Sequence, residues 1–187
     1  MKIRILHTAD LHLGMKFATR DYSPIVQERL SEARFETFGT LTEKANKQAI
    51  DLFVIAGDLF NGTKISRKDI IRAANILKTF EGRLALILPG NHDYVQKVDD
   101  PLWPVFQEMA PENVLFLDQA KAYDLRRYDL DVTVYAGPCT SKHSSVNAIG
   151  WILNSRKDIE TKFGIGIAHG SLLGNIASIS YAERGRL

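Results

Sequence analysis

The stretch Leu52-Phe53-Val54-Ile55-Ala56-Gly57-Asp58 sets the expected fold. Five consecutive apolar residues before a turn signal are typical of a strand that is buried on both faces of a sheet. The same arrangement, an apolar run followed by polar residues, recurs after Leu6, Leu88 and Ala168. Because these runs alternate with helical patterns, the sequence predicts an α/β fold built on a largely parallel sheet.

Each apolar run ends beside side chains that can bind a metal ion. The four segments are Asp10-Leu11-His12, Gly57-Asp58, Gly90-Asn91-His92-Asp93 and His169-Gly170. In open α/β sheets, ligands collect outside the carboxyl ends of the strands, so these segments should converge on one place. Carboxylate, imidazole and amide oxygen together suit Mn²⁺, Fe²⁺ or Zn²⁺ better than Ca²⁺.

Each segment taken alone also has an ordinary structural explanation. Asp10 and His12 would share one face only if strand geometry continued that far. Gly57 would let the backbone turn so that Asp58 bridges two cations, but Gly-Asp is also a common turn dipeptide. His169 alone would more often be a satisfied strand-end histidine. The joint occurrence of all four at successive strand ends favours a metal site.

The first half of the chain predicts two longer helices. One is expected over 25–47, with Ser23-Pro24 as its N-cap and first position. Its buried face would carry Val26, Leu30, Ala33, Phe38, Leu41 and Ala45. Ser66 with Asp69 resembles a capping box that opens the second helix. The buried residues of that helix would be Ile70, Ala73, Ala74 and Leu77.

The remaining elements follow from shorter patterns. Strands are expected over 2–7, 52–56, 84–88, 114–117 and 164–168, and residues 121–126 and 131–136 could pair as antiparallel strands. Helices are expected over 101–109 and 144–154, the second capped by Ser144 or Ser145. Residues 171–187 show no clear periodicity and are expected to form a loop. Without a repeat or a linker, residues 1–187 should form one domain.

Composition limits the classes of function. The 187 residues with 45% hydrophobic content suffice for a compact core. A net charge of +2 permits a nucleic-acid partner without demanding one. Cys139 is the only cysteine, so no intrachain disulfide can form, which fits a reducing compartment. Neither a secretory signal nor an apolar run of membrane-spanning length is present, so a cytoplasmic protein without a membrane partner is expected.

Five other side chains are of types that can take part in catalysis or binding, but they are expected to be structural. His7 should face a neighbour within the sheet, and His143 lies in a polar run that looks like a surface loop, with a substrate-contacting loop as the alternative. Cys139 has no convincing base partner, and Trp103 and Trp151 should be packing residues. The sequence has no P-loop, no Rossmann glycine fingerprint and no Gly-x-Ser-x-Gly elbow.

The four polar segments resemble the motifs of the calcineurin-like metallophosphoesterases. The pattern of that family is Asp-x-His, Gly-Asp, Gly-Asn-His-Asp/Glu, a later His and a final Gly-His-x-His. Residues 5–14, 54–60 and 88–93 resemble most closely the SbcD-type DNA repair nucleases. The similarity extends from residue 2 to about residue 173. It implies a layered sandwich of mixed β-sheets flanked by helices.

The resemblance also implies a set of metal ligands. Asp10 and His12 would hold one divalent ion, Asn91 and His169 would hold the other, and Asp58 would bridge the two. Manganese is the metal expected, with iron or zinc as alternatives.

The resemblance implies catalytic roles for two further residues. His92 would protonate the leaving oxygen or stabilise charge at phosphorus rather than bind metal. Asp93 would hydrogen-bond His92 and fix its orientation. A proton donor placed in this way contributes about 10²–10⁴-fold to rate.

One motif of the family is missing from this sequence. No Gly-His-x-His follows His169 before Leu187, and the capping region and ATPase-docking segment of the family are absent too. We expect the chain to be a C-terminally incomplete domain from a longer protein. The alternatives are ligands supplied by another chain, or a naturally shortened form of low activity.

The expected function is that of an SbcD-like two-metal phosphodiesterase, a DNA exonuclease or endonuclease of double-strand-break repair. An SbcC-type ATPase and a second copy of the chain would be its partners. The alternatives are a phosphodiesterase or phosphatase for nucleotides and other small esters, and a noncatalytic scaffold. The basic residues Lys64, Arg67, Lys68 and Arg72 could contact DNA phosphates, although a solvated helix face is the favoured explanation.

Overall fold

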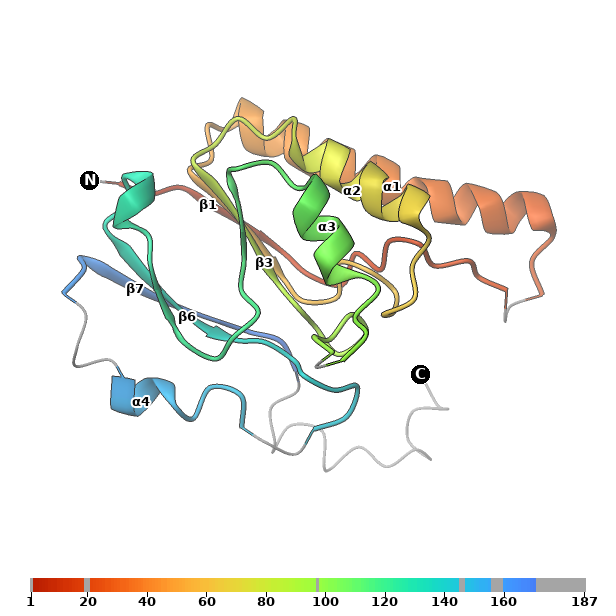
Figure 1. Ribbon diagram of the computed structural model, residues 1–187. Coiled ribbons are helices and arrows are strands. Elements are labelled where there is room, and N and C mark those ends of the chain that lie inside the picture. Colours follow the sequence, from red (N-terminus) through yellow and green to blue (C-terminus); the bar gives the residue numbers. More distant parts are fainter. Residues whose placement is uncertain (1, 19–20, 97, 145–146, 156–159, 171–187) are drawn as a thin grey trace, which may run out of the picture.

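Two stacked β-sheets with helices on their outer faces form the domain (Figure 1). The computed structural model describes residues 2–18, 21–96, 98–144, 147–155 and 160–170. The first sheet contains, in spatial order, β1 (Ile5–Thr8), β2 (Leu52–Ala56), β3 (Leu84–Leu88) and β4 (Val114–Phe116). The second contains β5 (Ala122–Asp124), β6 (Val132–Gly137) and β7 (Phe163–Ala168). The predicted layered α/β architecture is confirmed.

The first sheet is parallel throughout its described strands. Thr8 pairs with Ile55, and Ala56 pairs with Leu88, so the strands end at one common edge. All residues of β2 and β3 are buried, and their observed bounds match the prediction. Only β1 starts later than expected, at Ile5 rather than at residue 2.

The second sheet is the mixed one. β5 and β6 run antiparallel with Ala122 opposite Tyr135, as predicted, whereas β6 and β7 run parallel. The expectation that all four apolar runs belong to a single sheet is therefore wrong, because β7 pairs with β6. An apolar strand is buried in either layer of a sandwich, so its composition does not reveal which sheet it joins.

Three helices cover the outer face of the first sheet: α1 (Pro24–Lys47), α2 (Arg67–Leu77) and α3 (Trp103–Met109) (Figure 1). Ser23 occupies the N-cap position of α1 as predicted. The capping box of α2 is confirmed, because the Ser66 hydroxyl accepts a hydrogen bond from the backbone N–H of Asp69 at 3.2 Å. All four residues expected on the buried face of α2 are buried.

The buried face of α1 was predicted only in part. Its buried residues are Phe35, Phe38, Thr42 and Ala45, whereas Val26 is 41% exposed. The N-terminal turns of α1 extend beyond the sheet (Figure 1). Helical periodicity identifies an apolar stripe but does not show whether another element covers it.

A short helix, α4 (Ile152–Ser155), lies on the outer side of the second sheet (Figure 1). The helix expected over 144–154 is thus mostly wrong. The Asn147 side chain accepts the backbone N–H of Ile149 at 3.1 Å, forming a turn that competes with helix formation. Ser144 consequently does not cap α4, while Ser145 and residues 171–187 lie outside the described residues.

The core has two apolar clusters, one on each side of the first sheet. Trp103 is buried against Phe60, Phe106 and Phe116 between the sheet and the helices, which confirms its packing role. A short 3₁₀ turn, η1 (Arg126–Tyr128), joins β5 to β6. Within the described ranges, no helix has the length and apolar character needed to cross a bilayer.

Candidate metal centre

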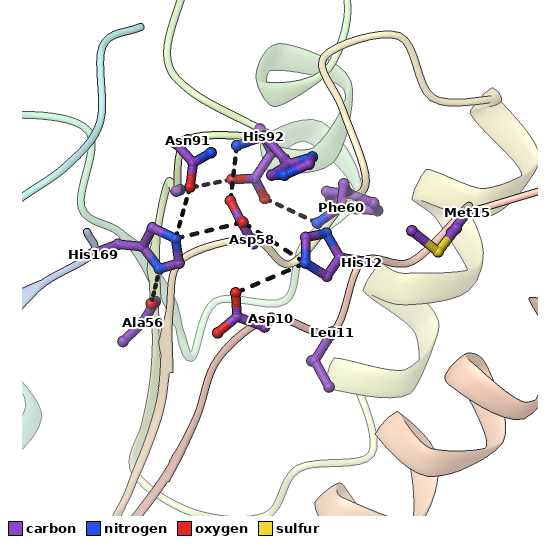
Figure 2. Close-up of polar contacts among 12 residues, drawn as sticks. Asp10, Leu11, His12, Met15, Ala56, Asp58, Phe60, Asn91, His92 and His169 are labelled. Atoms are coloured by element: carbon purple, nitrogen blue, oxygen red, sulfur yellow. Dashed lines mark hydrogen bonds and ion pairs between the residues drawn. The ribbon is translucent and has the colours of Figure 1, made fainter. Parts of the chain in front are cut away.

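The predicted site residues meet around Asp58 at the carboxyl edge of the first sheet (Figure 2). Two segments follow β1 and β2, a third follows β3, and the last follows β7 of the facing sheet. The side chains brought together are Asp10, His12, Asp58, Asn91, His92 and His169. The convergence expected from the sequence is therefore found, although it needs both sheets.

Asp58 lies at the centre with only 2% of its side chain exposed. Its Oδ1 accepts the backbone N–H of His92 at 2.8 Å, and its Oδ2 lies 3.4 Å from His169 Nε2 and 3.8 Å from His12 Nε2. Burial by itself would raise the pKa of Asp58, but His169 and the His92 N–H outweigh it and hold the pKa below its ordinary value. Asp58 is therefore an ionised carboxylate aimed at two imidazoles.

Two glycines make room for this carboxylate and its partner. Gly57 has φ 95°, and a Cβ at this position would collide with the ring of His169. A Cβ at Gly90 would collide with the carboxylate and backbone N–H of Asp58. Neither position can take a larger residue without moving the site.

Asp10 and His12 reach the site in a conformation that the sequence did not indicate. The strand ends at Thr8, and both residues have positive φ, 56° and 47°. Their side chains nevertheless converge, with His12 Nε2 3.8 Å from Asp10 Oδ1. Strand alternation, the predicted reason for their shared direction, is wrong. The cause is a left-handed turn held by hydrogen bonds from the Asp10 and His12 N–H groups to the Gly57 and Asp58 carbonyls, at 3.2 and 2.9 Å.

The imidazole of His12 is suited to accept a cation. Its side chain is 17% exposed. Burial lowers the pKa of His12, and the nearby Arg34 and His92 add to this effect against the opposing pull of Asp58. A metal ligand must be the neutral imidazole, so a lowered pKa favours the form that binds.

His169 shows most directly that the site favours positive charge. Its Nδ1 lies 2.9 Å from the carbonyl oxygen of Ala56, while Nε2 lies 3.1 Å from Asn91 Oδ1 and faces Asp58. The Asp58 carboxylate raises the pKa of His169 to about 9. At neutral pH an imidazolium N–H therefore points between two oxygens, where a cation would replace the proton. The bond to Ala56 would keep the ring oriented for that exchange.

The donor groups fit two divalent ions that share one carboxylate. Potential ligand atoms of His12, Asp58 and His92 lie within 4.8 Å of one another, and so do those of Asp10, Asp58 and His169. Asp58 belongs to both groups. The expected partition, with Asp10 and His12 on one ion and Asn91 and His169 on the other, stays a prediction, because proximity of ligand atoms alone does not assign an ion.

Asp93 supports the backbone of the site rather than His92. Its carboxylate is completely buried and accepts the backbone N–H groups of Phe60 at 2.9 Å and Gly90 at 2.7 Å. Burial raises the pKa of Asp93 to about 7, against the effect of those two bonds. The expected hydrogen bond from Asp93 to His92 is not among the contacts of the described residues. Asp93 instead ties the loop after β2 to the loop after β3.

Comparison with known proteins identifies the family. The sequence profile of the calcineurin-like phosphoesterases matches residues 3–178. The chain belongs to this family. Over 184 residues this phosphoesterase is 24% identical to an uncharacterized metallophosphoesterase, YhaO, of Bacillus subtilis, an alignment that covers 92% of the chain and 42% of the relative.

The phosphoesterase also resembles proteins named DNA double-strand break repair protein Mre11. It is 34% identical over 115 residues to that of Methanosarcina acetivorans, covering 58% of the chain and 17% of the relative. It is 31% identical over 135 residues to that of Methanosarcina mazei, covering 70% of the chain and 20% of the relative. The chain thus spans less than half the length of these relatives.

The side chains expected to be structural in this phosphoesterase lie outside the cluster or are inert. Burial raises the pKa of the Cys139 thiol to about 11, which disfavours the reactive thiolate. His143 is exposed in a loop, as predicted. His7 is exposed because β1 forms the edge of its sheet, so the expectation that it faces a neighbour is wrong. Trp151 packs beside Tyr135 on the second sheet.

The basic residues near the second segment are only partly available to an anion. Arg72 forms an ion pair with Glu32 at 2.7 Å and lies over the ring of Phe35. Lys68 is exposed on the same helix. The solvated helix face favoured from the sequence agrees with this arrangement.

Sequence reasoning missed one residue beside the site, Arg34 of α1. Its guanidinium donates a hydrogen bond to the carbonyl oxygen of Leu11, which lies between Asp10 and His12. No motif marks this contact. The available signal was a cationic residue adjoining Phe35 on the inward face of the helix.

Proposed function

We propose that this chain is the two-metal phosphoesterase part of an SbcD-like DNA nuclease. Membership of the calcineurin-like phosphoesterases supports hydrolysis of a phosphoester. The observation that carries the proposal is the buried carboxylate of Asp58, which two groups of ligand atoms share. The partial similarity to the Mre11 proteins, which are named for DNA double-strand break repair, supports DNA as the substrate.

Five side chains are proposed to hold the metal ions: Asp10, His12, Asp58, Asn91 and His169. Their mixture of carboxylate, imidazole and amide oxygen supports Mn²⁺, with Fe²⁺ or Zn²⁺ as alternatives. When bound, two such ions neutralise the charge of a phosphodiester and acidify a water molecule for attack.

His92 is proposed to act as the proton donor. Its backbone N–H is fixed on Asp58 Oδ1, and its ring meets the ring of His12 edge-on, with 4.7 Å between centroids. His92 is partly exposed, so its ring is accessible to a substrate oxygen. Donation to the leaving oxygen would contribute about 10²–10⁴-fold to the rate. Asp93 supports this step indirectly, because it holds Gly90 and thereby the loop that carries His92.

Replacing His92 tests the proposed division of labour. We expect His92→Ala to lower Mn²⁺-dependent DNA cleavage by about 10²–10⁴-fold while Mn²⁺ binding, measured by calorimetry, stays near that of the parent chain. His143→Ala, which removes an exposed histidine from a loop, should leave both quantities unchanged. If His92→Ala lost its metal instead, His92 would be a ligand, in line with its position beside His12 and Asp58.

The partners proposed from the resemblance are an SbcC-type ATPase and a second copy of the chain.

A small phosphoester is the rival substrate. The ion pair between Arg72 and Glu32 favours this rival, because the charge of Arg72 is already neutralised. Binding of a DNA duplex through several phosphates should weaken steeply as salt rises, whereas binding of a nucleotide should change little. Mn²⁺-dependent cleavage that disappears in His92→Ala would exclude the noncatalytic scaffold.

A further inference from the structure

The loop between β1 and α1 holds two proposed ligands in a backbone conformation that needs outside support. Asp10 and His12 both have positive φ, which L-residues rarely adopt because the Cβ approaches the backbone. Such residues persist where the surrounding structure over-determines them. The side of the loop that faces β2 is held by the bonds from the two N–H groups to Gly57 and Asp58.

The opposite side of the same loop is held by α1. Arg34 Nη1 donates to the carbonyl oxygen of Leu11 at 2.7 Å, and Nη2 lies 3.4 Å from the sulfur of Met15. The guanidinium also lies over the ring of Phe17, 5.3 Å from its centroid. One turn earlier on the helix, the Ser31 hydroxyl contacts the carbonyl oxygen of Met15 at 2.6 Å. Arg34 therefore contacts the loop at three points.

We propose that Arg34 is a positioning residue for the metal centre, which acts through the Leu11 carbonyl to fix Asp10 and His12 relative to each other. Leu11 is the residue between the two ligands, so a bond to its carbonyl restrains the peptide group that joins Leu11 to His12. The planar guanidinium can hold this oxygen and the Met15 sulfur at once, which the single ammonium of a lysine cannot do as well. This inference rests on the proposed metal-binding function.

A purely structural role would make Arg34 a tie between helix and loop that affects stability alone. Metal affinity separates the two roles, because residues that orient metal ligands typically change affinity by about 10–100-fold. We expect Arg34→Met to weaken binding of Mn²⁺ to the metal-free chain about tenfold by calorimetry. Arg34→Lys, which keeps the charge and can offer one N–H to Leu11, should lose less.

Arg29→Met is the matched control. Arg29 lies on the same helix, is 70% exposed, and pairs with Glu36 rather than with the loop. Arg29→Met removes the same charge as Arg34→Met, but Arg29 makes no hydrogen bond to the described residues of the loop. The Mn²⁺ affinity of Arg29→Met should therefore equal that of the parent chain. A second measurement needs no metal: the backbone amide resonance of His12, which belongs to the peptide group that Arg34 restrains, should move in the NMR spectrum of metal-free Arg34→Met and stay in place in Arg29→Met.

The possible outcomes separate this inference from the proposed function. A folded Arg34→Met chain with parental Mn²⁺ affinity and unmoved His12 resonances would overturn the positioning role, and so would an equal loss in Arg29→Met. If Arg34→Met fails to fold, Arg34→Lys is measured in its place. A Mn²⁺ affinity of Arg34→Lys equal to that of the parent chain would then overturn the positioning role. If the parent chain binds no Mn²⁺, the proposed function fails, and the His12 resonances alone decide whether Arg34 positions the loop.

Discussion

The two sheets contribute to the site in different ways. The first is held together by a parallel ladder whose central strands, β2 and β3, are buried along their whole length. Among the residues that the structure describes, the second contributes only His169, which follows a largely exposed strand whose Phe163 is 37% accessible. Five of the six clustered side chains thus stand on one rigid edge, and the sixth is brought to it from the facing sheet.

Direct contacts replace the ladder where the two sheets meet. The His169 ring bonds to the carbonyl oxygen of Ala56 at 2.9 Å, and the backbone N–H of Cys139, after β6, donates to the carbonyl oxygen of Pro89, after β3, at 3.1 Å. Gly57 provides the space in which the ring sits. The geometry around Asp58 therefore depends on packing between the two sheets as much as on strand pairing.

Metal binding should respond unequally to substitutions from the two sheets. Asp58→Asn removes the charge that both ligand groups share, so we expect both ions to be lost, with an affinity drop beyond the roughly 10–100-fold that supporting residues cost. His169→Gln should lose one ion and keep the other. Calorimetric stoichiometry with Mn²⁺ measures both changes. Loss of both ions in His169→Gln would show that the second sheet matters as much as the first.

Stability should depend on the tie within the first sheet. In Asp93→Asn, one of the buried N–H groups of Phe60 and Gly90 would face an amide NH₂, and we expect a loss of about 1–3 kcal/mol in unfolding free energy. Urea unfolding at pH 8 measures this change. Asp129→Asn, at a side chain that is 92% exposed, should stay within about 0.5 kcal/mol. Equal values for the two variants would remove Asp93 from the scaffold of the site.

The smallest expected effect is a pH dependence at the contact between the sheets. Because the pKa of His169 is raised to about 9 in the folded chain, its contribution to stability is complete below its ordinary pKa near 6.5 and is lost as pH rises through 9. Without metal, the melting temperature of the parent chain should fall between pH 6.5 and 9 more than that of His169→Gln. Parallel curves for the two chains would argue against the ion pair with Asp58.

The parts of the fold that sequence predicted best are those with one local cause. The first and last residues of β2 and β3 were predicted correctly, because strands that are buried on both faces consist of unbroken apolar runs. The capping box at Ser66 was found because its bonds join residues three apart. Features that depend on distant partners were less well predicted, as the exposed start of α1 shows. The turn at Asn147 was missed although its hydrogen bond is local.

The candidate site shows the same division. The side chains that meet at the site were predicted correctly, because each follows an apolar strand. The apolar pattern does not show that β7 belongs to the second sheet. Asp93 accepts hydrogen bonds from backbone N–H groups, and Arg34 donates one to a backbone carbonyl oxygen. No sequence motif marks either kind of partner, so neither contact was predicted. Positive φ at Asp10 and His12 was likewise missed, because both are residues that occupy ordinary conformations elsewhere.

The short distance between Asp58 Oδ2 and His169 Nε2, 3.4 Å, has a consequence for the resistance of the protein to degradation. An ion held between them would fasten one layer of the sandwich to the other, so part of its binding free energy would oppose unfolding, by about 2.7 kcal/mol at a free concentration one hundred times Kd. We therefore expect chelation to expose β7 to proteases before the rest of the domain. The supply of metal ions would then determine both how long the protein resists degradation and how fast it hydrolyses its substrate.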